Sequence, residues 1–268
     1  MRKQENKFQR IALGVAYDGS FCHGFKYQKT AKGVANYLYE ASRVISADVG
    51  PITCAGRTDA GVHAVEQVIH MDVPTGIDIK AWTHGMNRQL PLYVRVLWAQ
   101  IMDDDFHARF SAVARRYRYL IYTQAFQPVH LYNRAYHAYL DLDIDRLNAA
   151  SQMLLGEHDF SGFQASGCQA HHPNRCLQEL SWQRKGPWVI ATIKANAFLY
   201  KMVRNLMGAL LPIGYGKKPI DTAYQRLIHP KNNLPAQTAP PYALYLDRIY
   251  YDRYTIPRVE PWYENLVE

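Results

Sequence analysis

One short segment combines two glycines with a carboxylate and is the first candidate for chemistry: Cys54-Ala55-Gly56-Arg57-Thr58-Asp59-Ala60-Gly61-Val62-His63-Ala64. The glycines allow a tight backbone path and the close approach of a ligand. Arg57 and Asp59 are two residues apart, so in an extended loop their side chains can share one face. A neighbouring cation keeps a carboxylate ionised, which is the state that suits a nucleophile or a general base.

The same residue types also form ordinary turns. Gly, Thr and Asp are common in turns, and an Asp side chain often bonds its own backbone two residues further on. This segment alone therefore leaves a purely structural turn open as the alternative to a reactive Asp59.

A second candidate is the basic and aromatic run Arg115-Arg116-Tyr117-Arg118-Tyr119. In a strand, Arg116 and Arg118 face one side, and Arg115, Tyr117 and Tyr119 face the other. Such a strand can hold phosphate with one face and pack or stack bases with the other. A basic strand on a solvated surface is the alternative.

Two further basic clusters follow. Lys201-Met202-Val203-Arg204-Asn205 opens an apolar helix, where N-terminal amides and basic side chains favour an anion. Arg204 lies in a hydrophobic stretch and needs a partner, for which Asp59 is the candidate. His107-Ala108-Arg109-Phe110 is a basic and aromatic patch, with an interdomain surface as the alternative.

Cys168, His171, His172 and Cys176 are the one cluster with metal-ligand residue types. Structural zinc sites normally use paired C-x2-C or H-x3-H ligands, and this spacing lacks them. We therefore predict no metal here and expect His171 and His172 to be loop residues near RNA. The paired cysteines and His-x-Glu of a zinc deaminase are also missing.

Composition favours a globular protein with a polyanionic partner. The chain has 268 residues, 48% hydrophobic and 20% charged, and its net charge is +8. Twenty tyrosines are interleaved with the basic residues, and such rings can stack on unpaired bases, although most are expected in strands and the core. Nucleic acid is the favoured partner.

The chain shows no secretory signal after its basic start, Met1 to Lys7, and no run of about 18 apolar residues that would span a membrane. Its four cysteines are too scattered for a disulfide framework. We expect reduced thiols, no membrane association and a cytoplasmic location.

Hydrophobic periodicity predicts an α+β fold built from one supersecondary order used twice. The first half predicts, in turn, a strand, a helix, two strands, a helix and a strand, at 11–17, 34–45, 52–55, 67–73, 79–90 and 93–101. The second half repeats the order at 115–122, 144–155, 176–183, 189–196, 199–211 and 243–250. We predict two ferredoxin-like lobes, residues 1–105 and 106–268, with antiparallel sheets and a basic central cleft.

Taken together, these motifs resemble the tRNA pseudouridine synthase A family. The resemblance is carried by the segment from Gly56 to Ala64, by His107-Ala108-Arg109-Phe110 ahead of the 115–119 run, and by Asn196-Ala197-Phe198 ahead of Met202-Val203-Arg204-Asn205. It runs in order from Tyr17-Asp18-Gly19 to Leu244-Tyr245-Leu246, which is nearly the whole chain.

The resemblance implies isomerisation of uridine to pseudouridine at positions 38, 39 and 40 in the anticodon stem-loop of tRNA, by a homodimer without metal or organic cofactor. It makes Asp59 the nucleophile, with Tyr117 stacked on the target base and acting at its C5, and with Arg204 paired to Asp59. The residues expected to bind substrate are Arg57, Thr58, His63, Arg109, Arg116, Leu246 and Leu244, the two leucines lining the base pocket.

The chain departs from the family pattern at two places. Gly24-Phe25-Lys26-Tyr27-Gln28 stands where the family commonly has Gly-Trp-Gln-x-Gln, and Val34-Ala35 stands where Val-Gln opens the first helix. Both changes affect the expected RNA footprint rather than the catalytic set. From a different class, a non-catalytic RNA-binding protein or RNA chaperone is the alternative function.

Overall fold

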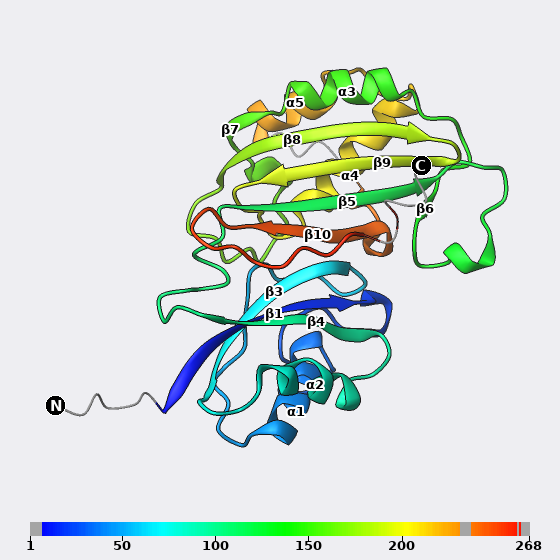
Figure 1. The fold of residues 1–268 in the computed structure, drawn as a ribbon. Helices are drawn as coiled ribbons and strands as arrows, with labels where there is room; N and C mark the ends of the chain where they lie inside the picture. Colours follow the sequence, from blue (N-terminus) through cyan, green and yellow to red (C-terminus); the bar gives the residue numbers. More distant parts are fainter. Residues whose placement is uncertain (1–6, 231–236, 262, 264–268) are drawn as a thin grey trace. The chain divides into compact units, whose positions relative to one another are not determined.

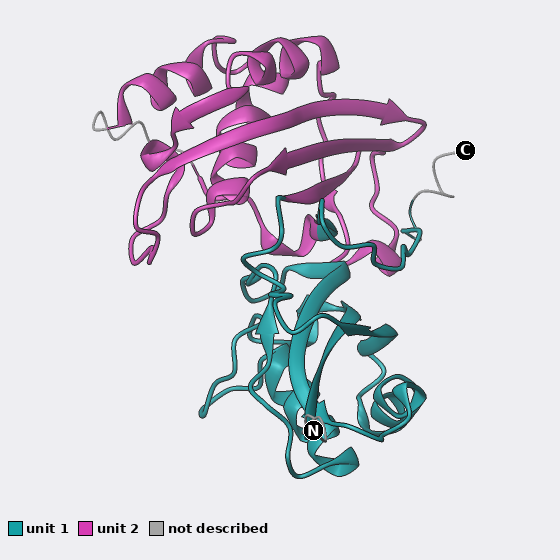
Figure 2. Cartoon of the chain, turned by 60° about the vertical axis from the view of Figure 1, so that its left-hand side comes forward, with its two compact units in different colours: residues 1–113, 246–264 teal, residues 114–245, 265–268 magenta. Residues whose placement is uncertain are grey.

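The structure is a computed structural model that describes residues 7–230, 237–261 and 263. Within these residues the chain divides into two units, shown in teal and magenta in Figure 2. The first takes in residues 7–113 and 246–261, and the second takes in residues 114–230 and 237–245. Most of the basic start, Met1 to Asn6, lies outside the described residues.

The first unit is a small antiparallel sheet with helices packed on it. Its helices and strands are β1 (Phe8–Tyr17), α1 (Val34–Ile45), β2 (Thr53–Cys54), β3 (His63–Pro74), α2 (His84–Gln89) and β4 (Val94–Met102). The strand order is β4-β1-β3, with β2 pairing β3, and each of these pairings is antiparallel. Helices α1 and α2 pack against each other on one side of these strands (Figure 1).

Helix α1 has the predicted bounds. The spacing of Val34, Leu38, Ala41 and Ile45 predicts this helix. The first three of these residues are buried, whereas Ile45 at the last position is partly exposed. Gly33 precedes the helix in an extended conformation, and its N–H donates to the side chain of Asn36 (3.0 Å). This contact satisfies a backbone group at the start of the helix, where no earlier turn can do so.

The single helix predicted over residues 79–90 is wrong. A 3-10 turn, Ile79–Trp82, comes first, and α2 begins only at His84. Asp78 accepts a hydrogen bond from the N–H of Lys80 (2.8 Å), and the Thr83 hydroxyl donates to the carbonyl of Lys80 (3.1 Å). These side-chain bonds compete with the α-helical pattern, which is a known effect of Asp and Thr near helix ends.

The second unit also combines a sheet with packed helices. Its helices and strands are β5 (Ala114–Tyr122), β6 (Tyr136–His137), α3 (Ile144–Gln152), β7 (Gly156–Asp159), β8 (Asn174–Lys185), β9 (Trp188–Ala195), α4 (Met202–Gly214) and α5 (Thr222–Ile228). The strand order is β5-β9-β8-β7, all antiparallel, and β6 adds a short parallel pair to β5. Helix α3 packs on β8 and on α4, which in turn packs on α5.

The sequence missed three of these elements. β6 and β7 are short, and the composition of β7, Gly-Glu-His-Asp, is polar and lacks an apolar alternation. Helix α5 has only seven residues. Helix α4 starts at Met202 rather than at Leu199, because Lys201 adopts a left-handed conformation (φ 58°) that a helix cannot include.

The remaining strand, β10 (Leu244–Tyr250), contains the point where the unit assignment changes. The predicted α+β class is confirmed, with mixed and mostly antiparallel strand pairing. No helix among the described residues is long and apolar enough to cross a membrane.

Candidate active site

The Asp59 loop, residues 55–62, connects β2 to β3 in the first unit, where a short strand turns back into a long one. At its start, Ala55 N–H donates to the carbonyl of Val68 (2.8 Å). The Gln67 side chain then binds both backbone groups of Gly56: its Oε1 accepts from Gly56 N–H (3.2 Å), and its Nε2 donates to Gly56 O. Gln67 is fully buried, so one amide side chain holds the loop from inside.

The middle of the loop is anchored through Thr58. This side chain is 8% exposed, and its hydroxyl lies 2.8 Å from the hydroxyl of Tyr17 at the end of β1. The Thr58 carbonyl accepts from Phe25 N–H (3.1 Å), and the Asp59 carbonyl accepts from Val62 N–H (3.2 Å). Asp59 itself is half-buried and Arg57 is exposed, so the carboxylate stands on a fixed backbone within reach of solvent.

Two glycines that follow β1 let the chain pack directly against this loop. A Cβ on Gly24, whose φ is 78°, would lie 2.9 Å from the carbonyl oxygen of Thr58 and 3.2 Å from the nitrogen of Ala60. A Cβ on Gly19 would lie 2.1 Å from the carbonyl oxygen of Val62. Only glycine fits at both positions without displacing the Asp59 loop.

His63 begins β3 and is buried. Gly19 N–H donates to its Nδ1 (3.2 Å), and Asp18 Oδ1 lies 3.1 Å from the same nitrogen. Nδ1 can therefore donate to the Asp18 carboxylate when it carries a hydrogen, and it can accept from Gly19 N–H when it does not. Nearby, burial raises the pKa of the Cys22 thiol to about 12, with the charge of Asp18 adding to the effect, so this thiol stays protonated at neutral pH.

The first unit also holds Arg109 and Leu246. Arg109 is exposed in a turn at residues 107–111, whereas Leu246 is fully buried in β10. The Arg109 guanidinium lies 5.5 Å from the centre of the Phe110 ring. Within this unit the structure thus describes Arg57, Thr58, Asp59, His63, Arg109 and Leu246.

In the second unit, β5 shows the predicted alternation. Arg115, Tyr117 and Tyr119 are buried, while Arg116 and Arg118 are half-buried. Tyr117 makes an edge-on contact with Phe198 (5.2 Å between ring centres), which fixes its ring. Arg116 lies opposite Lys194 of β9, so positive charge gathers on the other face.

Arg204 lies in the first turn of α4, half-buried. Its Nε donates to the carbonyl of Ala239 (2.8 Å), and Ala239 N–H donates to the carbonyl of Arg204 (3.0 Å). The chain at residues 237–239 approaches α4 so closely that a Cβ on Gly208 would lie 1.6 Å from the carbonyl oxygen of Gln237. Leu244, the other predicted pocket residue, is buried at the start of β10.

The residues predicted to act together thus fall into two sets, one in each unit. Asp59 lies on a loop, Tyr117 on a strand and Arg204 on a helix, while the pairing of Arg204 with Asp59 and the base contact of Tyr117 stay predictions. The sequence did not identify Gln67, Tyr17, Gly19 or Gly24 as supports of the Asp59 loop. The feature of the sequence that could have pointed to Gln67 is a polar amide side chain in a strand of mainly apolar residues.

The residues of the Cys168 loop, defined as 164–173, show a different character. His171 and His172 are exposed, and Cys168 accepts a hydrogen bond from Tyr200 N–H at 3.4 Å. In the described part of the chain, no three His, Cys, Asp or Glu side chains are grouped so that they could hold a metal ion.

Comparison with known proteins defines the class first. The family model described as tRNA pseudouridine synthase matches residues 150–252. Over its length the chain is 43% identical to tRNA pseudouridine synthase A of Shewanella amazonensis, covering 93% of this chain and 96% of that protein. Identity is also 43% with the protein of that name from Psychromonas ingrahamii (93% and 96% covered), and 41% with the one from Blochmanniella pennsylvanica (91% and 93% covered). The chain belongs to the tRNA pseudouridine synthase A family.

Proposed function

We propose that this protein, a tRNA pseudouridine synthase by family, converts uridine to pseudouridine at positions 38, 39 and 40 in the anticodon stem-loop of tRNA. The bond between C1′ of the ribose and N1 of the uracil breaks, and a bond forms between C1′ and C5. The proton lost from C5 is matched by one gained at N1, so the isomerisation is balanced without a metal or an organic cofactor.

In this proposal Asp59 is the nucleophile. The observation that carries the assignment is its support: a half-buried Asp59 stands on a backbone held by Gln67, by Phe25 N–H and by the Tyr17–Thr58 contact. A reacting group must be held in the correct position relative to the substrate. A rigid backbone holds it there, so the loop does not have to become ordered during the reaction.

The other roles follow the two residue sets. Tyr117 stacks on the target base and acts at C5, Arg204 pairs with Asp59, and Leu246 and Leu244 line the base pocket. Buried Tyr117 and the two buried leucines offer apolar surface that suits a base.

Arg57, Arg109 and Arg116 bind RNA phosphate, for which exposed or half-exposed guanidinium groups are suited. Thr58 and His63 complete the substrate-binding set. Both are buried beside the backbone of the Asp59 loop, so we expect them to act on the substrate close to Asp59.

We further infer two ferredoxin-like lobes, residues 1–105 and 106–268, that complete a basic cleft. In the first, the order β1-α1-β2-β3-α2-β4 and the antiparallel order β4-β1-β3 with β2 beside β3 support this assignment. In the second, the run β5-α3-β8-β9-α4-β10 supports it when the short elements β6, β7 and α5 are set aside.

We also infer a homodimer located in the cytoplasm, where tRNA is modified. Large apolar side chains exposed along residues 126–140, among them Phe126, Val129 and Tyr132, support a protein interface because such patches rarely face solvent alone. Light scattering should give twice the mass of the 30.9 kDa chain. A mass equal to one chain at micromolar concentration would contradict the dimer, and recovery outside the cytoplasmic fraction would contradict the location.

The function is tested with unmodified tRNA transcript and chemical mapping of pseudouridine by primer extension. We expect product at positions 38, 39 and 40 with the wild type and none with Asp59→Asn. The variant should still bind tRNA within a few-fold of the wild type, because affinity comes mainly from phosphate contacts. Asp48→Asn, a change of the same kind at an exposed carboxylate, is the matched control and should keep full activity.

Two outcomes would overturn parts of this proposal. A wild-type protein that binds tRNA but forms no pseudouridine would instead support an RNA chaperone. Equal turnover by wild type and Asp59→Asn would remove Asp59 from the mechanism.

A further inference from the structure

The turn at residues 107–111 presents an aromatic ring to solvent on a rigid support. Phe110 is 76% exposed, yet every backbone N–H from His107 to Ser111 donates a hydrogen bond. His107 N–H donates to the hydroxyl of Ser111 (3.0 Å), and Ser111 N–H donates back to the carbonyl of His107 (2.9 Å). His107 Nδ1 accepts from the N–H groups of Arg109 (3.2 Å) and Phe110 (3.1 Å).

The turn is tied to the core of the first unit by a second imidazole. Ala108 N–H donates to Nδ1 of His70 on β3 (3.0 Å), and the hydroxyl of Tyr251 donates to the carbonyl of Ala108 (2.7 Å). Burial lowers the pKa of His70 to about 4 and lowers the pKa of His107 below its usual value. Both rings are therefore neutral at physiological pH and available as acceptors.

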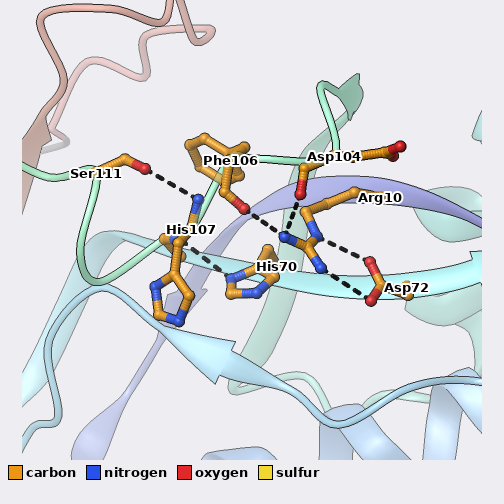
Figure 3. A network of polar contacts seen from close by, with 8 residues as sticks. Arg10, His70, Asp72, Asp104, Phe106, His107 and Ser111 are labelled. Carbon is orange, nitrogen blue, oxygen red and sulfur yellow. Dashed lines mark hydrogen bonds and ion pairs between the residues drawn. The ribbon is translucent and has the colours of Figure 1, made fainter.

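Arg10 holds the chain that leads into the turn. Its guanidinium binds the carboxylate of Asp72 (2.8 Å and 3.0 Å) and donates to the carbonyls of Asp104 (2.6 Å) and Phe106 (2.9 Å). Figure 3 shows these contacts converging on the Arg10 guanidinium beside His70. The turn thus starts from a fixed backbone rather than from a loose linker.

Three rings form a column from the core to the surface. His70 is buried, its ring centre is 4.7 Å from that of His107, and His107 is stacked on Phe110 at 4.3 Å with an interplanar angle of 29°. The Arg109 guanidinium lies 5.5 Å from the centre of the Phe110 ring. An exposed aromatic ring beside an arginine is the combination that holds unpaired bases in single-stranded RNA.

From this column, and given the proposed tRNA substrate, we propose that Phe110 is a stacking site for an unpaired nucleobase of the RNA. Because Tyr117 takes the uracil that is isomerised, the base on Phe110 belongs to another nucleotide. Arg109 supplies the charge for the neighbouring phosphate. The support already built into the turn means that binding orders little protein, which favours affinity.

The test compares Phe110→Leu with Phe110→Trp, and uses Phe8→Leu as the matched control. Leucine keeps an apolar side chain but removes the ring, whereas tryptophan keeps a stacking surface. Phe8 is also an exposed phenylalanine of the first unit, at 48% exposure, but it shares a surface depression with Asp103 and Asp104. Those carboxylates disfavour a polyanion there.

We expect about tenfold weaker binding of tRNA transcript by Phe110→Leu, in line with the loss of one base stack. Phe110→Trp and Phe8→Leu should stay within about twofold of the wild type. Because no charge is removed, the dependence of affinity on salt should be unchanged in Phe110→Leu, whereas Arg109→Gln should reduce its slope by about one. A transcript carrying 5-iodouridine in its unpaired loops should crosslink under ultraviolet light to the peptide that contains Phe110.

The inference is overturned if Phe110→Leu binds as the wild type does, or if Phe110→Trp or Phe8→Leu loses as much affinity as Phe110→Leu. Melting temperatures measured in parallel should be equal for all variants, since an exposed ring contributes little to folding. Failure of the proposed function is a separate result: the wild type would then bind tRNA without forming pseudouridine.

Discussion

The Asp59 loop and the Cys168 loop both concentrate residues that can do chemistry, but they are supported differently. In the Asp59 loop, Ala55, Thr58 and Val62 are buried, and hydrogen bonds reach its backbone from β3 and from the segment after β1. In the Cys168 loop, residues 169–172 are all exposed. Its hydrogen bonds include those at Ala165 and His172 near its ends and at Cys168 in its middle.

This difference shows that suitable residue types do not make a site unless the fold also holds them in place. A reacting group must be held within a fraction of an ångström, and this requires neighbours that are themselves fixed. Thiols and imidazoles on an exposed loop have the residue types of a metal site but not its geometry. Substitutions in each loop test this difference in support.

Apart from the loss of product in Asp59→Asn, the largest effect is expected from Gly24→Ala. The left-handed conformation alone costs about 1–2 kcal/mol for a residue with a Cβ, and here the methyl group would lie 2.9 Å from the Thr58 carbonyl oxygen. The Asp59 loop must shift, so pseudouridine formation should fall roughly a hundredfold, the effect of about a 1 Å misplacement. The measurement is the single-turnover rate on tRNA transcript.

Gly76→Ala is the control for this change. Gly76 has nearly the same backbone conformation (φ 83°), but no atom lies within 4 Å of an added Cβ. The free energy of unfolding of Gly76→Ala should fall by about as much as the backbone conformation alone costs, while its turnover rate stays at the wild-type level. Equal loss of activity in the two variants would show that general destabilisation, rather than displacement of the Asp59 loop, is responsible.

The smallest effect is expected from the Cys168 loop. Replacing the exposed His171 and His172 with Ala and the half-buried Cys168 with Ser should change the turnover rate by less than about twofold, since substitutions at and near the surface usually alter stability by under about 0.5 kcal/mol. The purified wild type should contain no stoichiometric zinc by elemental analysis. Bound zinc near one per chain that is lost in the variant would contradict this prediction.

Cys54→Ser and Cys168→Ser compare the two loops with the same substitution, because Cys54 lies at the edge of the Asp59 loop. Cys54 is 8% exposed at the end of β2, so it should lose more activity and stability than Cys168→Ser. Greater loss from Cys168→Ser would reverse the ranking of the two loops.

Much of the local structure could be predicted, and the failures have identifiable causes. The stripe of Val34, Leu38, Ala41 and Ile45 was enough to predict α1, and the alternation of arginine and tyrosine was enough to predict β5. The break after Trp82 was missed because Asp78 and Thr83 bond to the backbone locally, and hydrophobic spacing does not report such bonds.

For the site, the sequence shows which residue types stand next to each other: Asp59 between glycines, Tyr117 among arginines, and Phe110 beside Arg109. Periodicity and turn chemistry act over a few residues, so these features can be deduced without coordinates. What supports them depends on the tertiary fold. Gln67 beneath Gly56, Gly24 against Thr58, and His70 beneath the turn at Ala108 are contacts between distant parts of the chain, and they depend on how the strands pair and pack.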